Sequence, residues 1–341
     1  MHLSISKKYL NILYTLISPL AGLAVCVILI LLRAQNASDA LRTLFTGTFS
    51  SVYYAGSMLN TMALLLTAGL GASVAVKSGN MNLGGEGQIY AGGFTACLVM
   101  TSVHAHPVFV FTLALILSVA TGAALTLVSS FLKETRNASV LLTSFLVSAA
   151  VIPLIDGAIT KSKQDSTQNL LALPYIPQQF EFSRLLSPSP LNISFILALV
   201  LAVLTYMVLF RTRTGHALSI WGTAPEFAKY SGFSSSANSF GTLAVSGALH
   251  ALTGFFAVCG TYYTCHKGFY AGMGWNALTA SLIAANHPLY LILSSLVLAW
   301  LFNSAELLSL TQGFGFDISG IVQGVVLFTI AASTFKAGGR K

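Results

Sequence analysis

Residues 191–210 read LNISFILALVLAVLTYMVLF, a run without any charged side chain, and two arginines, Arg211 and Arg213, come right after it. A membrane-spanning α-helix needs about 20 mostly apolar residues, because it rises about 1.5 Å per residue through a hydrocarbon core of about 30 Å. Lysine and arginine are enriched in the loops on the cytoplasmic side of such helices. The stretch therefore predicts a transmembrane helix that ends on the cytoplasmic side.

Apolar runs of similar length recur along the chain, and together they predict about ten spans, with eight as the alternative count. Glycine-rich or proline-containing breaks divide the second run from the third and the eighth from the ninth. The runs lie at 13–32, 57–76, 86–103, 108–131, 138–157, 191–210, 238–260, 268–285, 289–308 and 318–335.

The composition indicates a surface that faces lipid. Of the 341 residues, 55% are hydrophobic and only 8% are charged, and the mean hydropathy is +0.78. A soluble globular domain carries about 25% charged residues, so this chain has too few to cover a water-facing surface. We therefore predict one all-α domain over residues 1–341, a polytopic transmembrane helix bundle in a lipid bilayer.

The first apolar run follows Lys7 and Lys8, as the apolar part of a signal peptide would. The run at 13–32 is longer than the roughly 7–15 residues of a signal peptide, and no small-residue cleavage site follows it. We expect it to be retained as the first transmembrane helix.

The net charge of +8 could suggest a nucleic-acid partner. The basic residues instead form short clusters between the apolar runs, without a basic stripe or interleaved aromatic residues, so we expect no nucleic acid to bind. With ten spans, most clusters fall on one side, which predicts cytoplasmic termini and a cytoplasmic segment at 211–236. The polar stretch at 158–190 is then an ordered external loop, too short to bury a core of its own.

The stretch GNMNLGGEGQ at 79–88 contains several glycines, which break or unwind a helix. One interpretation is a broken helix beside the transport path, with Asn82, Glu86 and Gln88 making polar contacts to other helices. The alternative is an ordinary cytoplasmic turn, with Glu86 placed favourably at the N-terminus of a helix. The residues themselves leave both interpretations open.

A short cytoplasmic helix is predicted after the sixth span. Thr223 and Glu226 have the spacing of a capping box, Pro225 suits a first turn, and Gly232 suits a helix end. The helix would present Phe227 and Tyr230, which suggests docking of a partner protein; an interfacial helix on lipid headgroups is the alternative. The residues of this coupling prediction are Thr223, Pro225, Glu226, Phe227, Tyr230 and Gly232.

Other motifs exclude several functions. The segment GASVAVKS at 71–78 lacks the second glycine of a phosphate-binding loop, so any ATP hydrolysis would occur in a separate chain. We find no catalytic constellation and expect neither enzymatic activity, nor a cofactor, nor a metal site. Acidic residues in or beside apolar runs are candidates for polar contacts inside the bundle. These are Asp156, Glu306 and Asp317.

At these motifs the sequence resembles a known family. The segment NLGGEGQ at 82–88 is similar to the signature of nucleoside and simple-sugar ABC importer permeases, which are related to ribose and branched-chain amino acid permeases. The segment FRTRTG at 210–215, with the residues that follow up to Gly232, resembles that family's cytoplasmic coupling segment. Ile321 to Gly324 resembles its C-terminal span, so the resemblance covers 57–333.

The resemblance also shows departures. Ala224 and Phe227 stand where the family commonly has asparagine and alanine, and Asn276 stands where an acidic residue is common. Asn276 is expected to border the transport path, so its identity leaves the substrate open.

The resemblance implies a permease subunit of a binding-protein-dependent ABC importer in a bacterial inner membrane. It implies three kinds of partner: ATP-binding subunits, a second permease chain, identical or not, and an extracytoplasmic substrate-binding lipoprotein. The substrate would be a nucleoside, riboflavin or a simple sugar, and a polar, uncharged cavity would serve any of them. The alternative is a secondary transporter driven by an ion gradient, which explains Glu86 equally well but not the aromatic cytoplasmic helix.

Overall fold

The computed structural model describes residues 2–161, 170–313 and 317–338, and side chains from residue 17 to 332 within those ranges. The described residues form thirteen α-helices with short 3₁₀ and π segments, and no β-strand among them, which confirms the all-α prediction. The elements are α1 (His2–Arg33), α2 (Ala37–Thr46), η1 (Gly47–Phe49), α3 (Val52–Lys77), α4 (Gly85–Ser102), α5 (Pro107–Arg136), α6 (Val140–Lys161), η2 (Gln178–Phe180), α7 (Ser194–Arg211), α8 (Arg213–Thr223), α9 (Pro225–Tyr230), α10 (Ser235–Ala257), η3 (Val258–Tyr262), α11 (Met273–Ile283), α12 (Pro288–Gln312) and α13 (Ile318–Gly338).

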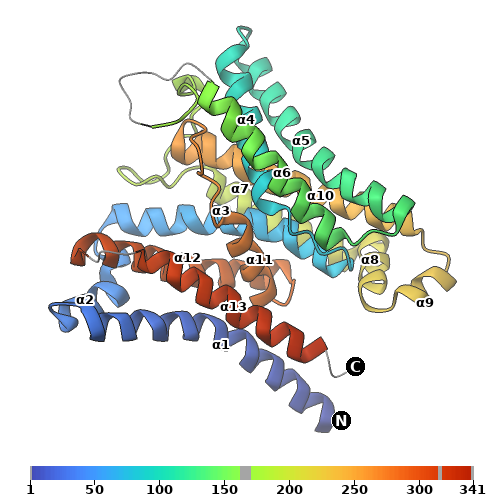
Figure 1. Cartoon of the computed structure of the whole chain (residues 1–341), viewed down its shortest axis with the longest axis horizontal. Helices are drawn as coiled ribbons and strands as arrows, with labels where there is room; N and C mark the ends of the chain where they lie inside the picture. Colours follow the sequence, from blue (N-terminus) through green and yellow to red (C-terminus); the bar gives the residue numbers. More distant parts are fainter. Residues whose placement is uncertain (1, 162–169, 314–316, 339–341) are drawn as a thin grey trace.

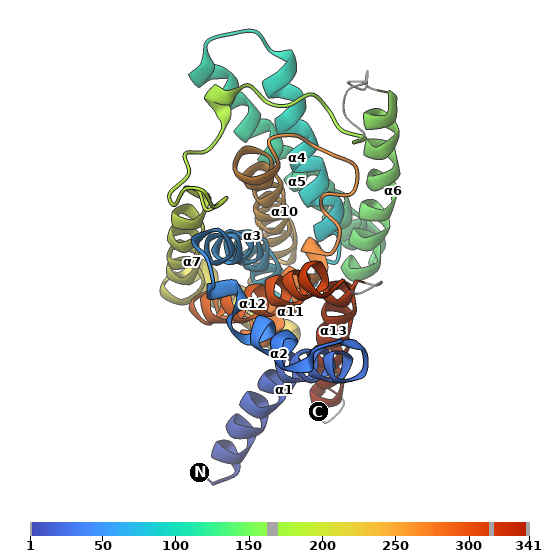
Figure 2. The same cartoon turned by 90° about the vertical axis from the view of Figure 1, so that its left-hand side faces the viewer.

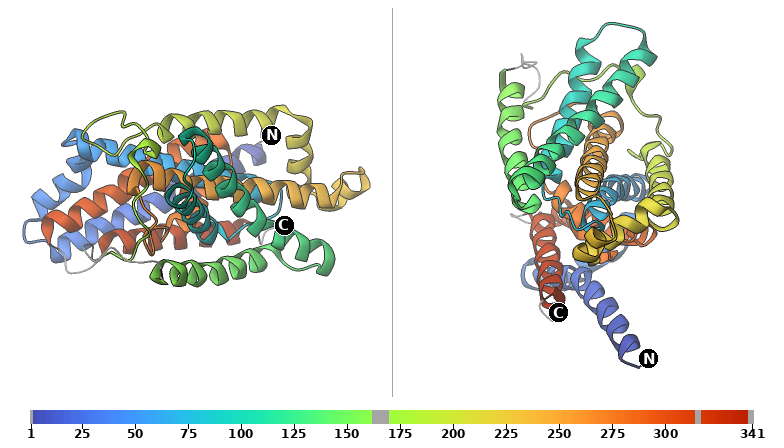
Figure 3. Two further views of the ribbon diagram at one scale, coloured as in Figure 1. Left: turned by 90° about the horizontal axis from the view of Figure 1, so that it is seen from above. Right: turned by 90° about the vertical axis from the view of Figure 1, so that its right-hand side faces the viewer.

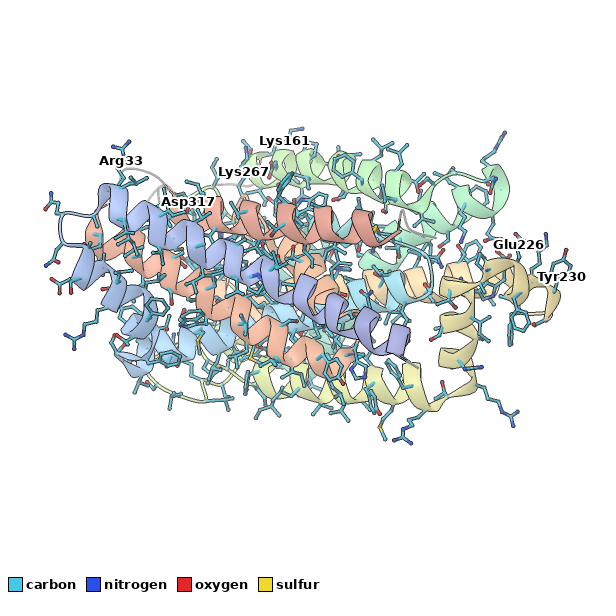
Figure 4. The ribbon with its side chains drawn as sticks, turned by 90° about the horizontal axis from the view of Figure 1, so that it is seen from below. Arg33, Lys161, Glu226, Tyr230, Lys267 and Asp317 are labelled. Carbon is cyan, nitrogen blue, oxygen red and sulfur yellow. The ribbon has the colours of Figure 1, made fainter. Side chains whose placement is uncertain are left out.

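The molecule is elongated, and its two ends differ. One end carries α8 and α9, and the other carries α2 and the loop at 170–193 (Figure 1). We call them the α9 end and the loop end. In Figure 4, Glu226 and Tyr230 lie at the α9 end, whereas Arg33, Lys267 and Asp317 lie toward the loop end.

The helices fall into exposed and buried groups. Few side chains of α5, α6 and α7 are buried, and large apolar ones such as Ile116 and Leu154 are 58% and 72% exposed. Such a surface suits the hydrocarbon of a bilayer. Most of α3 is buried, and it is apolar on every side, as expected of a helix in the middle of a bundle.

The predicted count of about ten spans is not confirmed. Six helices in the described residues are long and apolar enough to cross a membrane. Shorter apolar stretches belong to α1 at 17–33 and α13 at 318–332. The prediction of a complete span at 268–285 is wrong, because α11 has only 11 residues and is about 16 Å long. The six are α3, α5, α6, α7, α10 together with η3, and α12.

Small residues allow α10 to approach its neighbours closely. A Cβ atom on Gly254 would overlap the backbone of Ile89 in α4, and one on Gly247 would overlap the backbone of Gly122 in α5. Close backbone approach through small residues is the usual way in which helices pack in lipid. These contacts join α4, α5 and α10 into one group of three mutually packed helices, which lie together in Figure 2.

The first and last helices pack against each other. Ser18 Oγ in α1 donates a hydrogen bond to the Val326 carbonyl in α13 at 2.7 Å. Figure 3 shows this pair on the flank opposite α5 and α6. Helices at the two ends of the sequence are thus neighbours in the bundle.

The polar loop is ordered wherever the structure describes it. Between 170 and 190 it lies along the segment 259–267, with backbone N–H groups of Leu173 and Phe182 donating to the carbonyls of Cys265 (3.0 Å) and Cys259 (2.8 Å). Residues 162–169 of the predicted 158–190 loop lie outside the described residues. The loop is therefore held by backbone hydrogen bonds against the segment that follows α10.

Candidate functional site

Asn82 and Gln88 clamp the turn between α3 and α4. Asn82 Nδ2 donates to Gln88 Oε1 at 2.9 Å, and Gln88 Nε2 donates back to Asn82 Oδ1 at 3.0 Å. Asn82 Nδ2 also donates to Ser246 Oγ of α10 at 3.0 Å. The two side chains are 3% and 2% exposed. Buried amides that satisfy each other in this way hold a turn rigidly.

The same turn is tied to α5 and α10. Asn80 Nδ2 donates to Thr242 Oγ1 at 3.0 Å, and Asn80 Oδ1 accepts from Lys133 Nζ at 2.5 Å. Gly79 has a φ of +77°, and the backbone of Gly222 in α8 packs against it. A movement of α8 would therefore press directly on the turn that precedes α4.

Glu86 combines features of both interpretations of the 79–88 stretch. It lies in the first turn of α4, where a carboxylate interacts favourably with the helix dipole. Its Oε1 also accepts a hydrogen bond from the Gly272 backbone N–H at 2.8 Å. Asn82 and Glu86 border a space of only about 10 Å³, which is too small for a solute.

The backbone between α10 and α12, at 258–287, is irregular except for the short α11. After α10, the chain forms the π-turn η3, reverses at Tyr263 with a φ of +58°, and passes Gly272 with a φ of +79°. It then forms the short α11 and turns again at Ala285 and Asn286. The glycines at 268–274 were a signal for this break, but the length of the apolar run at 268–285 led to the prediction of a span.

A polar cavity of about 370 Å³ lies at the loop-end half of the bundle. A volume of roughly 300–1,000 Å³ is usual for small-molecule sites. Its wall combines α3, η3, α11, α12 and α13, and Pro190 of the loop. Polar side chains on this wall include Asn60, Thr61, Tyr262, Asn276, Asn303, Glu306 and Gln323.

Of the four residues predicted for the transport path, Asn276 lines this cavity. Its Nδ2 donates to Gln323 Oε1 at 2.9 Å, and Gln323 Nε2 donates to Ser319 Oγ at 3.1 Å. Asn82, Glu86 and Gln88 do not line it. The structure connects the two groups through Gly272, whose N–H donates to Glu86 and which lies four residues before Asn276.

The cavity is polar but not uncharged, because Glu306 belongs to its wall. The other acidic candidates have different surroundings. Asp156 Oδ1 accepts from the buried Tyr90 hydroxyl at 2.7 Å, as expected of a contact inside the bundle. Asp317 is exposed and caps the start of α13 by accepting from the Gly320 N–H at 3.0 Å.

The short helix predicted after the sixth apolar run is present as α9, but the predicted capping box is absent. The N-cap of α9 is Ala224, with no side-chain hydrogen bond, and Thr223 Oγ1 donates back to the Ser219 carbonyl within α8 at 2.9 Å. Thr223 is still helical, so its hydroxyl is taken by the preceding turn. Pro225 and Glu226 occupy the first turn as predicted.

The predicted end of α9 is confirmed. Gly232 has a φ of +80°, its N–H donates to the Lys229 carbonyl, and the Phe233 N–H donates to the Ala228 carbonyl. This pattern is the Schellman motif. Phe227 and Tyr230 are 61% and 88% exposed. Figure 4 shows Tyr230 at the tip of the α9 end.

Similarity to known proteins extends over most of this chain. It is 33% identical over 96% of its length to the probable riboflavin import permease protein RfuC of Treponema pallidum, 86% of which is covered. It is 24% identical to the guanosine ABC transporter permease protein NupP of Bacillus subtilis, over 96% of this chain and 95% of that one. It is 25% identical to the glucose ABC transporter permease protein TsgB13 of Haloferax volcanii, over 93% and 86%.

These relatives confirm the resemblance inferred from the 82–88 signature. The family model for the permease component of branched-chain amino acid transport systems matches residues 54–331. The match includes the 78–88 turn, the polar cavity and α9. The chain belongs to this family of ABC transporter permease components.

Proposed function

We propose that this chain is the membrane-spanning permease subunit of a binding-protein-dependent importer for a nucleoside, or a related solute with a ribityl or sugar portion. Riboflavin, guanosine and glucose, which appear in the names of its relatives, all carry several hydroxyl groups. The shared chemistry is a polyhydroxylated, uncharged solute of moderate size.

The observation that carries the proposal is the cavity of about 370 Å³ with amide and hydroxyl side chains on its wall. Such groups replace the hydrogen bonds that a polyhydroxylated solute loses when it leaves water. The cavity lies between the buried helix α3 and the irregular segment at 258–287. Polar groups are tolerated at membrane depth where they are enclosed by protein in this way. An apolar solute would gain nothing from this wall.

The remaining parts of the proposal concern partners. ATP-binding subunits would dock at α9, through Phe227 and Tyr230, and their movement would reach the 78–88 turn through Gly222 of α8. A second permease chain, identical or not, would complete the path. An extracytoplasmic lipoprotein would deliver solute at the loop end, which would face outward from a bacterial inner membrane with both termini in the cytoplasm.

A secondary transporter is the other function that the sequence left open. Membership of an ABC permease family does not favour it, and the Glu86 carboxylate has a structural role in accepting a hydrogen bond from the Gly272 N–H.

Uptake by the assembled transporter in proteoliposomes tests the proposal. The permease, its ATP-binding subunits and its binding protein are reconstituted, and riboflavin, guanosine and glucose are offered separately. We expect uptake of at least one of them that requires internal ATP and survives a protonophore. Uptake that persists without ATP and collapses with the protonophore would replace the proposal with the secondary transporter.

A further inference from the structure

Glu306 is a carboxylate on the cavity wall that has no hydrogen bond or ion pair with any described residue. It lies in α12, six residues before the helix ends at Gln312, or about 9 Å from that end along the axis. Its side chain is exposed. A carboxylate near the middle of a membrane costs about 2.5–3.5 kcal/mol, and a position near the loop end reduces that cost.

The neighbouring amides are already engaged. Asn60 Nδ2 donates to Thr261 Oγ1 at 2.9 Å, and its Oδ1 accepts from Asn192 Nδ2 at 2.9 Å. Asn276 and Gln323 are joined to each other. These side chains therefore shape the wall, and much of their hydrogen-bonding capacity is spent within the protein.

Two hydroxyl groups on the same wall are free in the described part of the chain. Tyr262 in η3 and Thr61 in α3 line the cavity without a hydrogen bond to another described residue. A hydroxyl both donates and accepts, whereas an ionised carboxylate accepts at two oxygens. Together with Glu306 they match a pair of neighbouring hydroxyl groups, each of which must donate one hydrogen bond and accept another.

We propose that Glu306, assisted by Tyr262 and Thr61, is the site that binds vicinal hydroxyl groups of the solute during its passage. The proposal rests on the proposed function and names the part of the solute that is recognised. Hydrogen bonds from two hydroxyls to one carboxylate are charge-assisted and stronger than neutral ones. The same negative charge repels phosphate esters, so the site also discriminates against phosphorylated forms of the solute.

The test measures binding of solutes to the permease and its ATP-binding subunits, assembled in lipid nanodiscs. The binding protein is left out, so that any preference between solutes comes from the permease. Riboflavin is compared with lumiflavin, which keeps the ring system but has a methyl group in place of the hydroxylated chain. Loss of hydrogen bonds to a charged group is expected to weaken binding about ten- to a hundredfold for lumiflavin. The phosphate ester of riboflavin should bind more weakly than riboflavin itself.

Three variants and one control complete the test. Glu306→Ala should bind riboflavin and lumiflavin equally, Glu306→Gln should retain part of the preference, and Tyr262→Phe should reduce it by a few fold. Glu181→Gln is the matched control, because Glu181 is a carboxylate of the loop at 170–193 that does not line this cavity. It should leave the preference unchanged.

The outcomes separate the two proposals. If the wild-type transporter imports riboflavin but Glu306→Ala keeps the full preference, the hydroxyl site is overturned and the proposed function stands. If neither uptake nor binding of riboflavin, guanosine or glucose is measured, the proposed function fails and the hydroxyl site falls with it. If Glu306→Gln, a nearly isosteric change, prevents assembly on size-exclusion chromatography, Glu306 belongs to a subunit contact and the hydroxyl site is overturned.

Discussion

Glu86 joins two segments that are far apart in the sequence. Its carboxylate accepts the Gly272 N–H at 2.8 Å, just before α11, while its backbone lies in the first turn of α4. The backbone N–H of Gly272, at a turn with a φ of +79°, finds its acceptor in this carboxylate. At the residue scale, Glu86 therefore positions the short helix that brings Asn276 to the cavity.

Substitution of Glu86 tests this role. Glu86→Gln retains an acceptor oxygen and the shape of the side chain, so we expect most of the uptake to remain. Glu86→Ala leaves the Gly272 N–H without its partner, at a cost of about 1–3 kcal/mol, and should abolish most uptake. ATP-driven uptake in membrane vesicles, normalised to the amount of permease in the membrane, is the measurement. Equal loss in both variants, together with sensitivity to a protonophore, would instead indicate that Glu86 carries a proton.

The α9 helix is the element that presents apolar groups to water at one end of the molecule. Phe227 and Tyr230 are largely exposed, whereas Ala228 between them is fully buried. Aromatic side chains of this kind are frequent at the centre of protein interfaces. Since their removal leaves no cavity inside the permease, their energetic role can be measured without loss of the fold.

We predict that Phe227→Ala combined with Tyr230→Ala weakens binding of the ATP-binding subunits. Truncation of interface anchors costs at least about 2 kcal/mol, or roughly thirtyfold in affinity. The measurement is the dissociation constant of the purified ATP-binding subunits for the permease in nanodiscs. Tyr175→Ala is the control, because Tyr175 is 52% exposed in the loop at the opposite end. Unchanged affinity in the double variant would assign α9 to the lipid headgroups.

The close contact between α4 and α10 can be tested by a second substitution at the element scale. A Cβ on Gly254 would overlap backbone atoms of Ile89 and Gly93, which cannot shift without separating the helices. Gly254→Ala should therefore destabilise the permease by about 1–3 kcal/mol, as overpacked cores do.

The matched control for Gly254 is Gly241 of the same helix. Gly241 has no described atom within 4 Å of an added Cβ, and alanine is the better helix former by about 0.5–1 kcal/mol. Gly241→Ala should thus leave the melting temperature unchanged or raise it slightly. Thermal unfolding of both variants in the same detergent compares them. Equal stability of the two variants would mean that α4 and α10 are less closely packed than in this structure.

The two ends of the whole molecule carry different kinds of structure. The short helices α8 and α9 and the basic helix ends Lys77 and Arg211 lie at the α9 end, while α2 and the loop at 170–193 lie at the other (Figure 1). Lysine and arginine favour the cytoplasmic side. We infer that the α9 end is inside the cell and the loop end outside.

Accessibility labelling tests this orientation. The four natural cysteines are buried, so single cysteines can be introduced at Lys229 and Gln179, which are exposed at opposite ends. In intact cells, we expect a membrane-impermeant maleimide to label Gln179→Cys alone, and both variants after permeabilisation. Labelling of Lys229→Cys from outside would invert the topology.

Much of the architecture follows from local sequence. The charge-free run at 191–210 became α7 (Ser194–Arg211), since a helix is the form in which a single segment satisfies its backbone in lipid. The turn at Gly79, the N-terminal position of Glu86 and the end of α9 at Gly232 also depend on a few adjacent residues. A glycine with positive φ needs no distant partner, so its effect is visible in the sequence.

Other features were decided by tertiary structure. Thr223 could not cap α9 because α8 continues to that residue, and α11 is short because the chain at 263–272 is held by the loop at 170–193 and by Glu86. The apolar run around Glu306 marked it as a candidate for a polar contact, but the cavity joins side chains from α3, η3, α11, α12 and α13, so no local pattern placed Glu306 on its wall. The sequence by itself determined that the chain is helical and apolar, because those properties belong to single segments. The packing of segments that are distant in the chain decided which polar side chains face one another.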